Sequence, residues 1–279
     1  MNGSAVTMLI DTGADGTALT RGTVEKLGLS PMHSDVSHFG MSGESENFVA
    51  RVKEISFGPV HWKAVNLDIV WDIESQQAAG PQRAGVIIGA DFLFHGDIEI
   101  FLAEQKFNFF EPTGCKEAFL AYWDKNASMV ELESLSDQDH RRTVTVEVNG
   151  QKIRALIDTG ATTSVINLAT AARLGVTPQS PGVVEINVTG IGKHHVSTWV
   201  APFDSFTIGD ETIKKSRIAI RDFWGASLSD SNNMGTAELV RDQPEMIIGT
   251  DFLKAHRVLF ALSQRRFYFS YLGGSVFYE

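Results

Sequence analysis

The sequence predicts a mainly β protein built as two similar lobes, each with a short helix. The first observation is that Asp11-Thr12-Gly13 recurs as Asp158-Thr159-Gly160, 147 residues later, and both triplets follow an apolar run and precede Ala. The second is that Ile87-Ile88-Gly89 and the residues after it recur at Ile247-Ile248-Gly249. The repeats keep their order and differ in length between these motifs, which is typical of a duplicated structural unit.

Each repeat reads as strands with one short helix. Apolar runs that end at the acidic triplets predict strands at residues 4–10 and 152–157, and the glycine of each triplet allows a sharp turn. Residues 23–27 and 168–174 predict helices that end at Gly28 and Gly175. Alternating segments at 49–57 and 211–220 predict further strands, and 116–123 is compatible with a helix.

The two repeats differ at their beginnings. Residues 143–148 alternate and run into Asn149-Gly150, a strong hairpin signal, whereas the first repeat opens directly at Asn2-Gly3. This suggests a truncated or processed form that lacks the outer strand, and a signal peptide or anchor could have been lost with it. The alternative is an authentic start whose outer strand is missing or replaced. Periplasmic, secreted and cytoplasmic locations all stay open.

Composition narrows the class of protein. A chain of 279 residues with 43% hydrophobic content suits two domains, which we place at 1–112 and 142–279 with a linker at 113–141. The net charge of -10 argues against a nucleic-acid partner, which would require clustered Lys and Arg. No apolar run reaches the ~20 residues of a membrane span. Cys115 is alone, so no intramolecular disulfide is expected.

The paired triplets predict the chemistry. Two carboxylates that face each other repel when both are ionised, so they share one proton. The ionised member can take a proton from water while the protonated member polarises a carbonyl group. Asp11 and Asp158 are therefore the candidate catalytic residues, supported by Thr12, Gly13, Thr159 and Gly160. Asp91 and Asp251 are expected to open short helices instead.

The segment from Thr7 to Leu19, including the Ala after Asp-Thr-Gly, resembles the active-site segment of retroviral-type aspartic proteases, the retropepsins. The resemblance covers nearly the whole chain in two copies. It implies two retropepsin-like β-barrel lobes related by a pseudo-two-fold axis, as in the bilobal pepsin-like enzymes, with one catalytic Asp in each. It also implies a glycine-containing flap over the substrate, for which the candidates are Met41, Ser42 and Gly43 in one lobe and Thr189, Gly190 and Ile191 in the other.

The expected function is an aspartic endopeptidase that cleaves an extended polypeptide, without cofactor or metal. The alternative is a non-catalytic binding or assembly module that retains the barrel. Retroviral enzymes are usually homodimers of chains with one Asp, so three pairings are open: the lobes can close within one chain, swap between two chains, or each pair with its own copy. We favour a monomeric pseudodimer, because a linker gives the second lobe a high effective concentration, and a homodimer remains an alternative.

Overall fold

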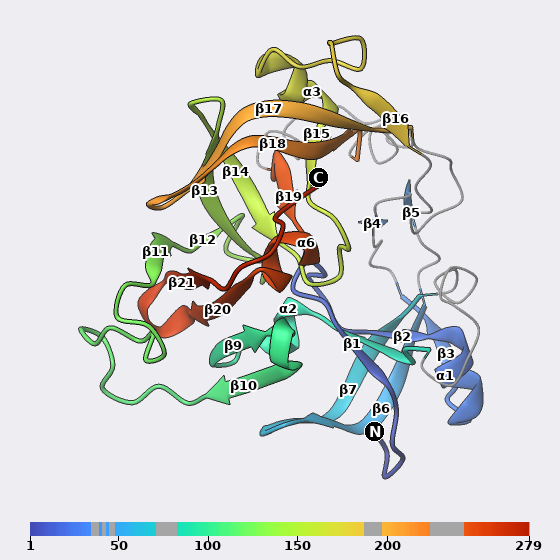
Figure 1. The fold of residues 1–279 in the computed structure, drawn as a ribbon. Coiled ribbons are helices and arrows are strands. Elements are labelled where there is room, and N and C mark those ends of the chain that lie inside the picture. The colour runs from blue at the N-terminus through green and yellow to red at the C-terminus, as the bar shows by residue number, and fades with distance from the viewer. Residues whose placement is uncertain are drawn as a thin grey trace.

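The computed structural model describes residues 1–34, 39–40, 43–44, 48–70, 83–186, 197–223 and 243–278. Strands account for most of these residues, and the helices are short (Figure 1). The mainly β class predicted from the sequence is therefore confirmed. Among the described residues, no helix has the length and apolar character needed to cross a bilayer.

The first repeat forms a six-stranded sheet with the order β1-β8-β2-β7-β6-β3. Its strands are β1 (Met8–Ile10), β2 (Ala18–Thr20), β3 (Pro31–His33), β6 (Phe48–Phe57), β7 (Val60–Val70) and β8 (Val86–Ile88). Helix α1 (Arg21–Lys26) follows β2, and α2 (Ala90–Leu93) follows β8. The short strands β4 (Phe39–Gly40) and β5 (Gly43–Glu44) pair separately and antiparallel.

The second repeat forms an eight-stranded sheet with the order β12-β13-β14-β19-β15-β18-β17-β16. Its strands are β12 (Glu133–Ser134), β13 (Arg142–Val148), β14 (Gln151–Ile157), β15 (Val165–Asn167), β16 (Val184–Ile186), β17 (Thr198–Ile208), β18 (Glu211–Arg221) and β19 (Met246–Ile248). Helix α3 (Leu168–Arg173) follows β15, and α6 (Thr250–Lys254) follows β19. The order from β14 to β16 repeats that of the first sheet, so the internal duplication is confirmed, with β12 and β13 as additions.

A third sheet joins the two repeats (Figure 1). Its strands lie in the order β10-β9-β20-β21-β11, and β9 pairs with β20 across the repeats. The bounds are β9 (Asp97–Phe101), β10 (Lys106–Phe110), β11 (Ser128–Glu131), β20 (His256–Ala261) and β21 (Arg266–Tyr271), with the 3₁₀ helices η2 (Leu102–Glu104) and η3 (Leu262–Gln264). Ile98 and Phe260 in the two central strands are fully buried in one apolar core that includes residues of both repeats.

The segment between the repeats packs on this third sheet. Residues 116–123 form turns and irregular structure, so the helix expected there is wrong. Tertiary partners hold this segment: the Gln264 side chain donates to the Ala118 carbonyl oxygen at 2.7 Å, and the Trp123 indole donates to Ser270 Oγ at 3.1 Å. The division into 1–112, 113–141 and 142–279 stays a prediction.

The two Asn-Gly turns are alike in conformation. Asn2 and Gly3 have φ values of 47° and 76°, and Asn149 and Gly150 have 50° and 73°. Successive positive φ angles are typical of the tight turns of β-hairpins. The Asn2 side chain accepts hydrogen bonds from the backbone of Lys53 and Glu54 in β6, and Asn149 does the same with residues of β17. Each turn is thereby tied to the long hairpin of its own lobe.

Candidate active site

The two Asp-Thr-Gly turns begin where two equivalent strands end. Asp11 follows β1 and Asp158 follows β14, each of which pairs in parallel with the short apolar strand β8 or β19. The Asp11 amide donates to the Ile88 carbonyl oxygen at 3.0 Å, and the Asp158 amide donates to that of Ile248 at 2.9 Å. The buried apolar strands β8 and β19 thus place Asp11 and Asp158 at equivalent positions in the two lobes.

Each carboxylate is fixed by its own turn. Asp11 Oδ1 accepts from the amides of Gly13 and Ala14, both at 3.0 Å, and Asp158 Oδ1 accepts from Gly160 at 2.7 Å and Ala161 at 3.2 Å. The two carboxyl groups also lie close enough for each to shift the pKa of the other. Asp11 and Asp158 of one chain therefore lie together. Of the three pairings that the sequence left open, this is closure of the two lobes within one molecule.

The glycines of the triplets make this approach possible. A Cβ atom at Gly13 would lie 2.5 Å from both Asp158 carboxylate oxygens, and one at Gly160 would lie 2.5 Å from Asp11 Cγ. Both distances are well inside van der Waals contact. Each carboxyl group therefore occupies the space above the glycine of the opposite turn.

The threonines of the triplets hold the two lobes together. Thr12 Oγ1 donates to the Ile157 carbonyl oxygen at 2.7 Å and accepts from the Thr159 amide at 3.1 Å. Thr159 Oγ1 donates to the Ile10 carbonyl oxygen at 2.8 Å and accepts from the Thr12 amide at 3.0 Å. These four reciprocal bonds set the turns side by side, so the hydroxyl groups contact backbone of the other lobe rather than of their own turn.

Replacing Thr12 by Val is expected to destabilise the fold by about 2–4 kcal/mol, because the Ile157 carbonyl and the Thr159 amide would both lose a buried partner. Urea denaturation would measure the free energy of unfolding. The control is Thr212→Val, whose exposed hydroxyl has the Thr207 hydroxyl as its hydrogen-bond partner among the described residues and should cost less than about 0.5 kcal/mol. Equal losses in the two variants would contradict the role given to Thr12.

The carboxyl groups of Asp11 and Asp158 have raised pKa values. Burial, followed by the negative charge of Asp11, raises the pKa of Asp158 well above its ordinary value. Burial also raises the pKa of Asp11, although hydrogen bonds from Asp158, Ala14 and Gly13 act in the opposite direction. The pair therefore keeps one proton at pH values where an isolated Asp has lost it.

This proton predicts how stability depends on pH. Below the ordinary Asp pKa of 3.8, both the folded and the unfolded chain bind the proton. As the pH rises, the unfolded chain releases it first, so the contribution of Asp158 to stability falls until the pH passes its raised folded pKa. The free energy of unfolding of the wild type, minus that of Asp158→Asn, should therefore decrease between pH 4 and neutrality. A difference that stays constant or increases in urea titrations would contradict this sign.

Two further carboxylates hydrogen-bond to hydroxyl groups that follow the two triplets in the sequence. Asp91 Oδ1 accepts from Thr17 Oγ1 at 2.7 Å, and this hydroxyl accepts from the Gly89 amide at 3.0 Å. In the second lobe, Asp251 binds Ser164, whose hydroxyl accepts from the Gly249 amide at 2.9 Å. Asp91 and Asp251 lie in the first turns of α2 and α6, as expected, although Gly89 and Gly249 occupy the N-cap positions.

Sequence reasoning missed the partners of these aspartates. Thr17 and Ser164 are buried, and they occupy equivalent positions in the two repeats. Both carry a hydroxyl group, six residues after the catalytic candidate of their lobe. A hydroxyl residue at the same spacing in both repeats could have identified these partners from the sequence.

The flap candidates are only partly within the described residues. Gly43 lies in β5 and is paired with Gly40 of β4 in an antiparallel hairpin. Met41, Ser42, Thr189, Gly190 and Ile191 lie outside the described residues. Their role in substrate binding stays a prediction.

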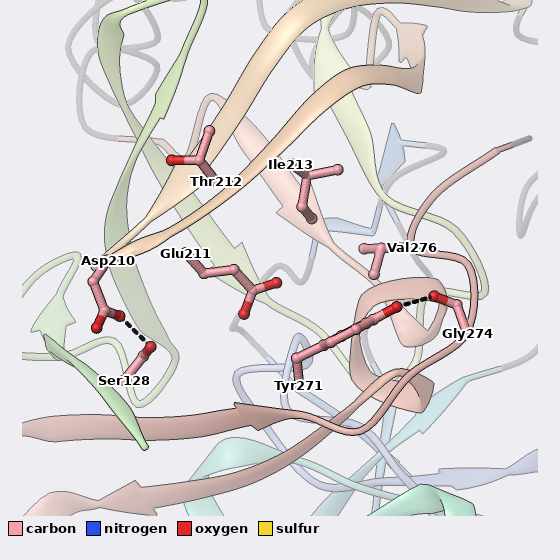
Figure 2. A pocket seen from close by; sticks show the side chains of 8 residues that line it. All are labelled: Ser128, Asp210, Glu211, Thr212, Ile213, Tyr271, Gly274 and Val276. Atoms are coloured by element: carbon pink, nitrogen blue, oxygen red, sulfur yellow. Dashed lines mark hydrogen bonds between the residues drawn. The ribbon is translucent and has the colours of Figure 1, made fainter. Parts of the chain in front are cut away.

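A hollow of about 530 Å³ lies apart from the two triplets (Figure 2). It is bordered by the start of β18, by Ser128 of β11 and by the C-terminal segment with Gly274 and Val276. Its carboxylates already have partners: Asp210 accepts from Ser128, and Glu211 Oε1 lies 3.0 Å from Nε2 of the buried His256. No residue of either Asp-Thr-Gly triplet lines it, so the hollow does not belong to the dyad.

A family model described as aspartyl protease matches residues 1–92 and matches again at residues 144–252. The two matches cover most of the chain, and each contains one Asp-Thr-Gly turn. The chain belongs to the aspartyl protease family. Within this family it is a tandem protein, with two retropepsin-like lobes in one polypeptide.

Solved structures of aspartic proteases are also similar to the chain. The EIAV protease in complex with an inhibitor is 28% identical over 41% of this chain and 86% of that one, with a TM-score of 0.27. A retropepsin-like aspartic protease from Rickettsia conorii is 14% identical over 44% and 73%, with a TM-score of 0.28. The aspartic proteinase from Irpex lacteus is 14% identical over 96% and 90%, with a TM-score of 0.49. No curated protein sequence gives a significant match.

Proposed function

We propose that this protein is an aspartic endopeptidase whose catalytic residues are Asp11 and Asp158. The observation that carries the proposal is the position of two half-buried carboxyl groups, one from each lobe, each of which lies against the glycine of the opposite turn and has a raised pKa. Two carboxyl groups held close together cost stability, and perturbed titration of facing groups is typical of catalytic sites. Thr12, Gly13, Thr159 and Gly160 support the pair through the contacts described above.

The shared proton gives the two carboxyl groups different roles at the start of the reaction. With the proton on Asp158, this residue donates it to the oxygen of the scissile carbonyl, while ionised Asp11 takes a proton from the attacking water. The water oxygen bonds to the carbonyl carbon, which gives a tetrahedral diol. Asp11 then donates its proton to the amide nitrogen as the carbon–nitrogen bond breaks. Asp158 recovers a proton from one hydroxyl of the diol, so the products leave and the dyad returns to its starting state.

The substrate of this reaction is an extended polypeptide. The two turns meet across a pseudo-two-fold axis, so they face a substrate strand that runs through the boundary between the lobes. The flap candidates Met41, Ser42, Gly43, Thr189, Gly190 and Ile191 would cover this strand with backbone hydrogen bonds. The active unit is a single chain, because both carboxylates and all four threonine bonds belong to one molecule.

Isotope labelling of the cleavage products tests the proposal. The protein is incubated with a denatured protein in ¹⁸O-labelled water between pH 4 and pH 7, and the peptides are analysed by mass spectrometry. We expect new carboxyl termini that carry one labelled oxygen, together with loss of activity at high pH as the dyad gives up its shared proton. Binding of the denatured protein without new termini at any pH would favour the non-catalytic module instead.

A further inference from the structure

The segment that follows β21 turns back onto the second lobe and runs beside β18 and β19 (Figure 1). The Leu272 amide donates to the Ala255 carbonyl oxygen at 2.8 Å, and the Tyr278 amide donates to that of Arg217 in β18 at 3.0 Å. Tyr278 and Arg217 also form an antiparallel bridge. Residues 272–278 are therefore attached to the second lobe at both ends.

Phe277 fixes the direction of this segment. Its φ angle is 67°, in the left-handed region that bulky residues avoid. The side chain is nonetheless only 7% exposed, and its ring centroid lies 5.0 Å from that of Phe206 in the core of the lobe. Backbone strain of this kind persists only where the surrounding packing imposes it. The burial of Phe277 therefore determines the place of the next residue, Tyr278.

Tyr278 packs against an apolar cluster next to the turn that carries Asp158. The buried members of this cluster are Val165, Ala219, Phe223 and Ile247, and its partly buried members are Ala161 and Tyr278. Ala161 directly follows the Asp-Thr-Gly triplet, and its amide donates to Asp158 Oδ1 at 3.2 Å. Because Ala161 and Tyr278 are the half-buried members, the cluster reaches the surface at these two side chains, close to the carboxyl group of Asp158.

The equivalent place in the first lobe is more polar. β2 pairs in parallel with β7 through Ala18 and Asp68, as β15 pairs with β18 through Val165 and Ala219. The first lobe therefore has a carboxylate where the second has a methyl group. Asp68 Oδ2 would lie 3.7 Å from a Cβ atom at Gly16, in the turn that follows the first triplet. The two sides of the dyad thus offer different surfaces to a substrate.

The returning segment is a further difference between the lobes. β10 is equivalent to β21, 160 residues earlier, but the residues after β10 pack on the sheet that joins the repeats. There the Gln264 side chain donates to the carbonyl oxygen of Ala118, the position equivalent to Tyr278. Tyr278 also lies outside residues 1–92 and 144–252, which match the family model. Its place beside the dyad is therefore not part of the family pattern.

We propose that Tyr278 is a specificity-determining residue, whose ring lines an apolar subsite beside Asp158 and limits the size of the substrate side chain that enters it. This role rests on the proposed endopeptidase function and narrows its substrate class. The preferred polypeptides have a small apolar side chain, such as that of Ala or Val, close to the scissile bond on the side of the second lobe. A charged side chain would lose its hydration against the cluster, and a large one would need the space that the ring occupies.

Cleavage of a peptide library tests this role. Peptides from a digested proteome are incubated with the wild type, with Tyr278→Ala and with Tyr278→Trp, and the residues around the new termini are compared by mass spectrometry. Tyr278→Ala opens the subsite, so kcat/KM for Leu and Phe relative to Ala and Val should rise about tenfold at one position, on one side of the bond. Tyr278→Trp fills more space and should shift the preference the other way, toward Ala over Val. These ratios compare substrates within one reaction, so they do not depend on the fraction of enzyme that is folded.

Two further variants serve as controls. Tyr278→Phe retains the ring and should keep the wild-type preference. Leu272→Ala shortens an exposed side chain of the same segment and should change the ratios less than about twofold. An unchanged preference in both Tyr278→Ala and Tyr278→Trp, or an equal change in Leu272→Ala, would overturn the role of Tyr278 and leave the protease function in place. If the wild type yields no new termini from the library, the protease function itself is overturned, and the subsite with it.

Discussion

Replacing Asp158 by Asn is expected to reduce peptide cleavage by about 10²–10⁴-fold while the fold is retained, because the amide removes the proton donor of the dyad. Asp11→Asn should cause a loss of similar size, since it removes the acceptor of the water proton. The two residues act as one unit, so the double variant should be little worse than either single variant. Initial rates on a denatured protein substrate, with circular dichroism as the check on folding, would measure these effects.

The matched control for this experiment is Asp210→Asn. Asp210 is an exposed carboxylate of the same lobe that contacts Ser128 and lies outside both triplets. Its replacement should leave the rate within twofold of the wild type. If either dyad variant keeps more than about a tenth of the activity, the shared-proton mechanism is wrong.

Replacing Gly89 by Ala is expected to cost about 3 kcal/mol of stability, at the upper end of overpacking effects. The added Cβ would lie 2.5 Å from the carbonyl carbon and oxygen of Gly16 and 3.0 Å from the Ala14 carbonyl oxygen. These are backbone atoms of the turn that carries Asp11, and they cannot move aside as a flexible side chain would. The clash also displaces the Ala90 amide, which donates to the Ala14 carbonyl at 2.8 Å. Activity should therefore fall together with stability.

The control is Gly16→Ala, because the backbone of Gly16 forms the other side of the contact with Gly89. Gly16 is exposed, and its new Cβ would meet only Asp68 Oδ2 at 3.7 Å, an ordinary contact distance. We expect a change of less than about 0.5 kcal/mol. Similar losses of stability at the two positions in urea denaturation would show that close packing of Gly89 against the turn is not the cause.

Much of the candidate site could be read from the sequence because the chain carries it twice. A single Asp-Thr-Gly is an ordinary turn. A second copy in the same frame, with matching apolar runs before each triplet, indicates that the two belong to one paired site. The same doubling predicted the strands that lead into Asp11 and Asp158 and the helices at α1 and α3. These features depend on local patterns, which is why periodicity and turn chemistry were sufficient.

Residues 116–123 show where local patterns were insufficient. Their sequence is compatible with a helix, yet Gln264 and Ser270, more than a hundred residues away, bind groups of this segment and select turns. The hydroxyl groups of Thr12 and Thr159 donate to backbone carbonyl groups of the opposite lobe. Long-range partners of this kind leave no pattern within a short window of sequence.

The sequence by itself determined the mainly β class, the duplication, and the identity of the two facing acidic turns, because these follow from residue types at fixed spacing. Only the tertiary structure decided that one chain closes on itself and that β9 and β20 join the repeats in a common sheet. The raised pKa values of Asp11 and Asp158 also belong to the tertiary structure. They arise from burial and from a neighbour 147 residues away, which only the folded chain brings into contact.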